Sequence, residues 1–262
     1  MTNDLRISIL QADIAWEDKA KNLENYGTLL SGLQGKSDLA VVPEMFTTGF
    51  SMQASHLAET NDGTTIQTLK RLSQTVDLAI AGSFLAKNDD GKLYNRGFFI
   101  TPSGESFFAD KRHLFRLGGE DKVFTPGLTY PILSCKNWNI RLIVCYDLRF
   151  PVWSRNQNNE YDLLLCTANW PRARANVWKT LLQARAIENQ CYVCGVNRIG
   201  QHGKIIDYQG DSILVDYKGF PITEAPTDRQ AILTTTIKRE SLLDFRQKFP
   251  VGKDADRFQI IF

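Results

Sequence analysis

The chain has 262 residues, of which 43% are hydrophobic and 23% are charged, and its formal net charge is +2. This balance is typical of a globular protein with a large core, and it excludes a disordered chain. The near-neutral charge gives no indication of a nucleic-acid-binding surface, and no apolar run approaches the roughly 18 residues of a membrane span.

The cysteines indicate a reducing, cytoplasmic setting. Their number, five, is odd and argues against a disulfide framework, and residues 1–6 lack the basic and apolar segments of a signal peptide. Cys191 and Cys194 lie three apart in a strand-like stretch, so we expect their side chains on opposite faces and in a structural role. The three histidines have no metal-ligand spacing, and we expect no metal site.

Strands and amphipathic helices alternate through the first half of the chain. The segment "LRISILQADI" predicts a strand, and the spacing of Tyr26, Leu30 and Leu33 predicts a helix over residues 17–33. The next predicted elements are the strand "DLAVV", the helix "TIQTLKRLSQT" and the strand "LAIAGSFLA". Two strands follow at residues 93–101 and 105–110, separated by the turn "TPSGE".

The second half continues this alternation. We predict the strands "WNIRLIV" and "DLLLCTAN", a helix over residues 174–189, short strands to about residue 236, and a last helix near residues 238–245. There is no low-complexity linker and no internal repeat. The pattern therefore favours one α/β domain with a mixed sheet over residues 1–262.

Three polar residues follow predicted strands. Glu44, Lys111 and Cys145 come after "LAVV", "SFFAD" and "IRLIV", and strand ends are where open α/β sheets gather their sites. A free cysteine is mostly protonated at neutral pH, so a nucleophilic cysteine needs a base. A carboxylate can take the thiol proton and an ammonium can stabilise the oxyanion, so this set requires no histidine.

Each of these residues also has a structural interpretation. A cysteine at a strand end is often only packed, as we expect for Cys166, and a glutamate or lysine there is often solvated. A papain-like site would need His113 as its base, but in that family the histidine follows the cysteine. We expect Asp147 to bond N–H groups of the loop near Cys145 and expect Arg185 and Glu188 to form a scaffold pair.

Three blocks of the sequence resemble the signatures of the nitrilase (carbon–nitrogen hydrolase) superfamily. They are "VVPEMFTTGF", "DKRHLFRLGGED" and "CYDLRFP", at residues 41–50, 110–121 and 145–151, in the order of that family. The later segments "ANWPRAR" and "YQGDS" resemble its ω-amidase branch. The resemblance extends from residue 5 to about residue 258.

This resemblance implies a four-layer αββα sandwich and roles for specific residues. Glu44 is then the general base, Lys111 the oxyanion stabiliser and Cys145 the nucleophile, while Glu120 orients Lys111 and the Tyr146 backbone N–H is a second oxyanion donor. No metal or organic cofactor is needed. The resemblance also implies a homodimer, with the helix at residues 174–189 in the interface and the tail from residue 245 reaching the partner.

Arginines are the natural anchors for a substrate carboxylate. Arg172 and Arg174 follow the "ANWP" loop and are the preferred anchors, whereas Arg149 is more easily explained as an ion-paired structural residue. Aromatic side chains are expected to form the walls of a small pocket; they are Phe50, Phe115, Tyr146 and Trp170.

We therefore expect an amidase that hydrolyses the terminal amide of a small α-keto dicarboxylic monoamide, such as α-ketoglutaramate or α-ketosuccinamate. Its partner is then a small-molecule amide, with no nucleic acid or membrane involved. Two alternatives stay open: another hydrolase of the superfamily, either a nitrilase or an N-carbamoyl amidohydrolase, and a catalytically silent interaction module.

Overall fold

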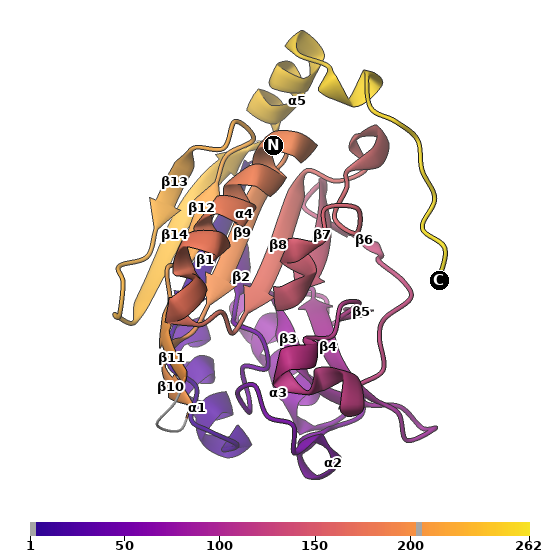
Figure 1. Cartoon of the computed structure of the whole chain (residues 1–262). Coiled ribbons are helices and arrows are strands. Elements are labelled where there is room, and N and C mark those ends of the chain that lie inside the picture. Colours follow the sequence, from indigo (N-terminus) through magenta and orange to yellow (C-terminus); the bar gives the residue numbers. More distant parts are fainter. Residues whose placement is uncertain (1–3, 203–205) are drawn as a thin grey trace.

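The computed structural model describes residues 4–202 and 206–262, and it contains two six-stranded sheets packed face to face (Figure 1). The first sheet has the strand order β14-β1-β2-β3-β4-β5, in which β1, β2 and β3 are parallel. Its strands are β1 (Asp4–Gln11), β2 (Leu39–Val41), β3 (Ala79–Lys87), β4 (Leu93–Ile100), β5 (Ser106–Asp110) and β14 (Ala231–Lys238).

The second sheet has the order β13-β12-β9-β8-β7-β6, with β7, β8 and β9 parallel. Its strands are β6 (Ile132–Cys135), β7 (Trp138–Val144), β8 (Leu163–Ala168), β9 (Tyr192–Asn197), β12 (Ile213–Val215) and β13 (Pro221–Glu224). A separate antiparallel pair, β10 (Ile199–His202) and β11 (Ile206–Gln209), extends beyond this sheet.

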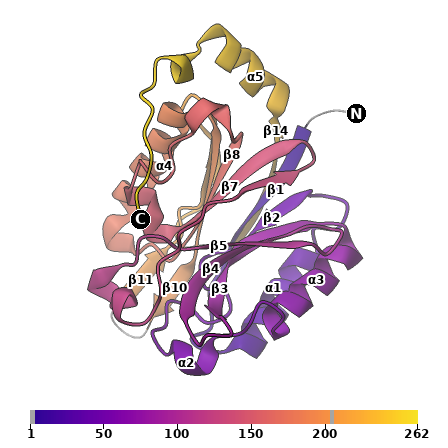
Figure 2. The same cartoon turned by 90° about the vertical axis from the view of Figure 1, so that its right-hand side faces the viewer.

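Helices cover the two outer faces and complete the four layers that the resemblance implies (Figure 2). On the first sheet lie α1 (Lys19–Ser31) and α3 (Thr64–Val76), and on the second lies α4 (Ala175–Asn189). These helices confirm the predictions for residues 17–33, 65–75 and 174–189. The short α2 (Ala54–Leu57) was not predicted.

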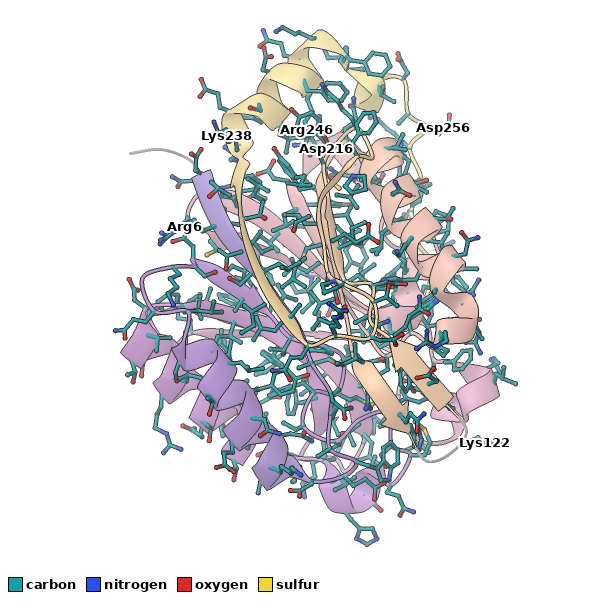
Figure 3. All side chains as sticks on the ribbon, turned by 90° about the vertical axis from the view of Figure 1, so that its left-hand side faces the viewer. Arg6, Lys122, Asp216, Lys238, Arg246 and Asp256 are labelled. Carbon is teal, nitrogen blue, oxygen red and sulfur yellow. The ribbon has the colours of Figure 1, made fainter. Side chains whose placement is uncertain are left out.

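The core separates into layers because side chains alternate along each strand. Ile7 and Ile9 of β1 point inward and belong to the same core cluster as Ile140 and Leu142 of β7, while Leu10 packs under the helices of the first sheet. Side chains fill the space between the sheets (Figure 3). The same alternation places Cys191 and Cys194 in different layers, as their spacing predicted.

The chain ends with α5 (Arg239–Lys248), which confirms the last predicted helix. Its Arg246 reaches into the second sheet, where Nη1 lies 2.9 Å from Asp162 Oδ1 and Nη2 donates to the Tyr161 carbonyl oxygen at 2.7 Å. The segment after α5 runs back along the same chain (Figure 1), and the Phe262 ring lies edge-on to Trp153. None of the helices in the two described ranges is long and apolar enough to cross a membrane.

Candidate active site

Four polar residues meet where strands of both sheets end. Glu44 follows β2, Lys111 follows β5, Cys145 follows β7 and Asn169 follows β8, and all four are buried. β2 and β3 are parallel, and both β3–β4 and β4–β5 are antiparallel, so β5 runs parallel to β2. The carboxyl ends of these strands therefore face one crevice, as expected for the first three residues from their positions after strands.

Glu44 is held at both carboxylate oxygens. Oε1 accepts hydrogen bonds from Lys111 Nζ at 2.9 Å and from Asn95 Nδ2 at 2.7 Å. Oε2 accepts from the Asn169 backbone N–H at 2.9 Å and from Asn169 Nδ2 at 3.2 Å. A buried carboxylate needs such donors to remain charged, and together they fix the orientation of Glu44.

Lys111 lies between two carboxylates. Its Nζ is 2.9 Å from Glu44 Oε1 and 2.7 Å from Glu120 Oε2, with all three side chains buried. Burial by itself would lower the pKa of Lys111, but the charges of Glu120 and Glu44 outweigh it and raise that pKa well above its ordinary value. Lys111 is thus a permanent positive charge in this site.

Glu120 is positioned by a turn. The preceding Gly119 has φ of 79°, a conformation that glycine adopts without strain, and Glu120 Oε2 accepts the Phe115 N–H at 2.7 Å. Burial raises the pKa of Glu120, the Lys111 charge opposes this rise, and the nearby Glu44 adds to it. Glu120 is therefore a second buried carboxylate in contact with Lys111.

Cys145 lies on a strained turn. Its φ is 48°, which is uncommon for a residue with a side chain, and it directly follows the last residue of β7. Asp147 holds this turn, because its Oδ2 accepts the Val144 N–H at 3.1 Å and its Oδ1 accepts the His113 N–H at 2.8 Å. The expected structural role of Asp147 is confirmed, and it also pairs with the His113 ring.

The Cys145 thiol is protonated in this environment. Burial and then the Glu44 carboxylate raise its pKa well above the ordinary value, and the Lys111 ammonium only partly opposes them. Cys145 therefore does not rest as a thiolate. A reaction at its sulfur would need a base, and Glu44 is the carboxylate that contributes to its raised pKa.

A cavity of about 220 Å³ opens onto Cys145. It is large enough for a small organic molecule, and five of its fourteen lining residues are aromatic. The residues that line it are Phe50, Lys111, Phe115, Leu117, Gly118, Cys145, Tyr146, Arg149, Asn169, Trp170, Pro171, Arg174, Ile206 and Tyr208. All four expected aromatic walls are among them.

Two arginines reach this cavity and one does not. The Arg149 guanidinium lies over the Trp170 ring at 5.2 Å, and that of Arg174 lies over the Phe115 ring at the same distance. Neither makes an ion pair with any other described residue, so Arg149 is not the ion-paired residue that we expected. Arg172 corrects our order of preference: it pairs instead with Asp207 and Asp228 and lies outside the cavity lining.

Sequence reasoning missed two members of the site. Asn95 lies inside β4 and donates to both Glu44 and Glu120, at 2.7 Å and 3.1 Å. An asparagine within a buried apolar strand is the only signal that marked it. Asn169 is the last residue of the predicted strand "DLLLCTAN", so the strand-end reasoning used for Cys145 could have been applied to it. No group of three or more potential metal ligands occurs within residues 4–202 and 206–262.

Comparison with known proteins agrees with this geometry. The model of the carbon–nitrogen hydrolase family matches residues 6–247. The chain belongs to the carbon–nitrogen hydrolase family. The ω-amidase YafV of Yersinia enterocolitica is 42% identical over 98% of this chain and 99% of its own, and the 2-oxoglutaramate amidase of Bacillus subtilis is 28% identical over 95% and 96%.

Solved structures of the carbon–nitrogen hydrolase family share the fold. XC1258 from Xanthomonas campestris, a member crystallised with an arsenic adduct in its active site, superposes with a TM-score of 0.95 at 42% identity, covering 98% of this chain and 99% of that one. Nit3 of Saccharomyces cerevisiae superposes with a TM-score of 0.86 at 22% identity and over 95% of both chains, a likeness of fold alone. The family and the sandwich implied by the three sequence blocks are confirmed.

Proposed function

We propose that this protein is an ω-amidase, which hydrolyses the terminal amide of small α-keto dicarboxylic monoamides of the α-ketoglutaramate and α-ketosuccinamate type. The observation that carries the proposal is the setting of Glu44. This buried carboxylate accepts hydrogen bonds at both oxygens and lies near Cys145, whose thiol is protonated. The names of the ω-amidase and 2-oxoglutaramate amidase relatives support the substrate class.

In the proposed mechanism Glu44 takes the proton of Cys145 as the sulfur attacks the amide carbonyl carbon. The Lys111 ammonium and the Tyr146 backbone N–H stabilise the tetrahedral oxyanion, and Glu120 keeps Lys111 in place. Protonated Glu44 then donates its proton to the leaving nitrogen, and ammonia departs. Water activated by Glu44 hydrolyses the resulting thioester to the acid and restores the thiol.

The two unpaired arginines supply the proposed specificity. Bringing the free carboxylate of the substrate into an aromatic cavity without a cation is unfavourable, and Arg149 and Arg174 are the guanidinium groups in the lining. The amide then lies at Cys145 and the carboxylate at the rim, one short chain away.

We also propose a homodimer and a cytoplasmic location. The exposed face of α4 is a surface through which two sandwiches can pack, with the tail from residue 245 at the interface. All five cysteines are free thiols, which suits a reducing compartment.

Ammonia release across a panel of substrates tests the function. We expect α-ketoglutaramate and α-ketosuccinamate to give the highest kcat/KM, and the matching nitriles, N-carbamoyl amino acids and neutral amides to give much lower values. Cys145→Ala should abolish turnover, and Cys145→Ser should nearly do so, since a carboxylate base activates a hydroxyl poorly.

Three outcomes would contradict the proposal. A preference for nitriles or for N-carbamoyl compounds would identify another branch of the family. Wild-type activity in Cys145→Ala would exclude the thioester. No turnover, together with no trapping of Cys145 by thiol reagents, would leave the silent interaction module.

A further inference from the structure

In the side-chain amide of Asn169, the nitrogen makes hydrogen bonds and the oxygen makes none to the described residues. Its Nδ2 donates to the Glu44 backbone carbonyl at 2.7 Å and to Glu44 Oε2 at 3.2 Å. Its Oδ1 is buried and has no hydrogen-bond partner among the described residues. The residue is 6% exposed and lines the cavity beside Cys145.

The orientation of this amide is determined by its neighbours. Exchanging the nitrogen and oxygen would place Oδ1 2.7 Å from the Glu44 carbonyl oxygen, so that two acceptors would face each other. The free oxygen is therefore a true acceptor. A buried acceptor without a donor is unfavourable, and in a substrate cavity it indicates that a ligand brings the donor.

The leaving group of the substrate brings N–H donors to this place. In the proposed mechanism its nitrogen must approach Glu44 to receive a proton, and Glu44 Oε2 is the oxygen that Asn169 holds, at 2.9 Å from the backbone N–H. A primary amide carries two N–H groups on that nitrogen. Nitriles and esters carry none, and an ester presents an oxygen acceptor instead.

We propose that Asn169 Oδ1 accepts a hydrogen bond from the NH₂ group of the substrate, and that this contact selects primary amides over nitriles and esters. The inference rests on the proposed amidase function. It makes Asn169 a specificity-determining residue as well as a support for Glu44. Sites built to bond a substrate N–H discriminate strongly against analogues without it, because the protein group is then left unpaired.

The experiment compares two substrates of the same acid, the amide that the wild type hydrolyses best and its methyl ester. The measured quantity is the ratio of kcat/KM for the amide to that for the ester. In Asn169→Ala we expect this ratio to fall by about 10–100-fold, the loss of one substrate hydrogen bond that only the amide makes.

Asn95→Ala is the matched control. It removes one side-chain amide donor from the other oxygen of Glu44 but does not line the cavity. We expect it to slow both substrates together, with a ratio within about threefold of the wild type. Asn169→Ser, which retains a small polar group, serves as a second variant if Asn169→Ala does not fold, and its ratio should also fall.

The inference would be overturned if the amide-to-ester ratio of kcat/KM were equal in the Asn169 and Asn95 variants. Asn169 would then act only through Glu44. That result, with an active wild type, leaves the amidase function standing. A wild type that releases no ammonia from any amide would instead overturn the proposed function.

Discussion

The Glu44 carboxylate helps to raise the pKa of Cys145, and this sets a test at the residue scale. Glu44→Gln removes the charge that, after burial, does most to raise the pKa of Cys145, so the thiol should become more acidic. The same substitution removes the proposed base, and kcat should fall by at least about 100-fold. A more reactive thiol in a nearly inactive enzyme is the expected combination.

The measurement is the rate of iodoacetamide labelling against pH, followed by peptide mapping. In the wild type, labelling of Cys145 should rise only at high pH, and in Glu44→Gln the rise should move to lower pH. Cys135 is the internal control, because burial raises its pKa to about 11. A Glu44→Gln enzyme with normal turnover would exclude Glu44 as the base.

The arginines permit a second test at this scale. Replacing Arg149 or Arg174 with Met should raise KM for the dicarboxylic monoamide by about 10–100-fold, the loss of one charge-assisted pair. Hydrolysis of a neutral amide should hardly change. Arg172→Met is the matched control, since that side chain pairs with Asp207 and Asp228 outside the cavity. If the Arg149 and Arg174 variants both keep the wild-type KM, the carboxylate is bound elsewhere.

At the scale of elements, Asp38 links the two sheets just before β2. Its carboxylate binds Arg6 Nη2 of β1 at 2.8 Å and Lys136 Nζ of the β6–β7 turn at 2.5 Å. Arg6 lies at the edge of the molecule in Figure 3. Burial would raise the pKa of Asp38, but hydrogen bonds from Arg6 and Lys136 outweigh it and lower that pKa to about 2.

The lowered pKa gives this pair a definite pH dependence. The carboxyl of Asp38 is more acidic in the folded state than in the unfolded state. Its contribution to the free energy of unfolding is therefore complete above the unfolded pKa, near 4, and disappears as the pH falls through about 2. Arg6 and Lys136 are 41% and 56% exposed, so solvent screening reduces the contribution to about 1–2 kcal/mol.

Asp38→Asn should therefore lower the free energy of unfolding by about 1–2 kcal/mol at pH 7, and by about half as much at pH 3. Urea titrations at pH 7, 5, 4 and 3 measure this difference. Asp90→Asn is the control, because the Asp90–Lys92 pair is exposed and its loss should have no measurable effect. A pH-independent difference would show that packing, rather than charge, explains the effect of Asp38→Asn.

At the scale of the whole molecule, the face around α4 carries exposed apolar side chains. Ile187 on α4 is 55% exposed and Phe220 on the neighbouring turn is 66% exposed. Gln183 Nε2 donates to the Gly219 carbonyl oxygen at 3.0 Å, so this turn lies against the helix. An apolar area of this kind is suited to the proposed dimer.

Light scattering should give twice the 29.7 kDa chain mass for the wild type and a shift to the single-chain mass for Ile187→Glu. Leu128→Glu is the control, since Leu128 is equally exposed at 56% but lies on the loop before β6. A wild type that scatters as a single chain at micromolar concentration would contradict the dimer.

Most helices and strands, and several residues of the candidate site, were predictable from local patterns. Hydrophobic periodicity located α1, α3 and α4 to within a few residues, because an amphipathic helix must bury one stripe in any fold. Glu44, Lys111 and Cys145 could be grouped because each follows a predicted strand, but this position alone did not single them out. The three sequence blocks did so, and they added the family and Glu120.

Contacts between distant segments were decided only by the tertiary structure. Asn95 and Asn169 are 51 and 125 residues from Glu44 along the chain, and their meeting depends on how strands of two sheets align. Arg172 and Arg174 looked equivalent in the sequence. In the structure they differ, because Asp207 and Asp228 bind the Arg172 side chain outside the cavity. These two carboxylates are 35 and 56 residues from Arg172 along the chain. Arg174 makes no such pair and lines the cavity. A long cationic side chain pairs with whichever carboxylate the fold brings within reach, and no local sequence pattern encodes that choice.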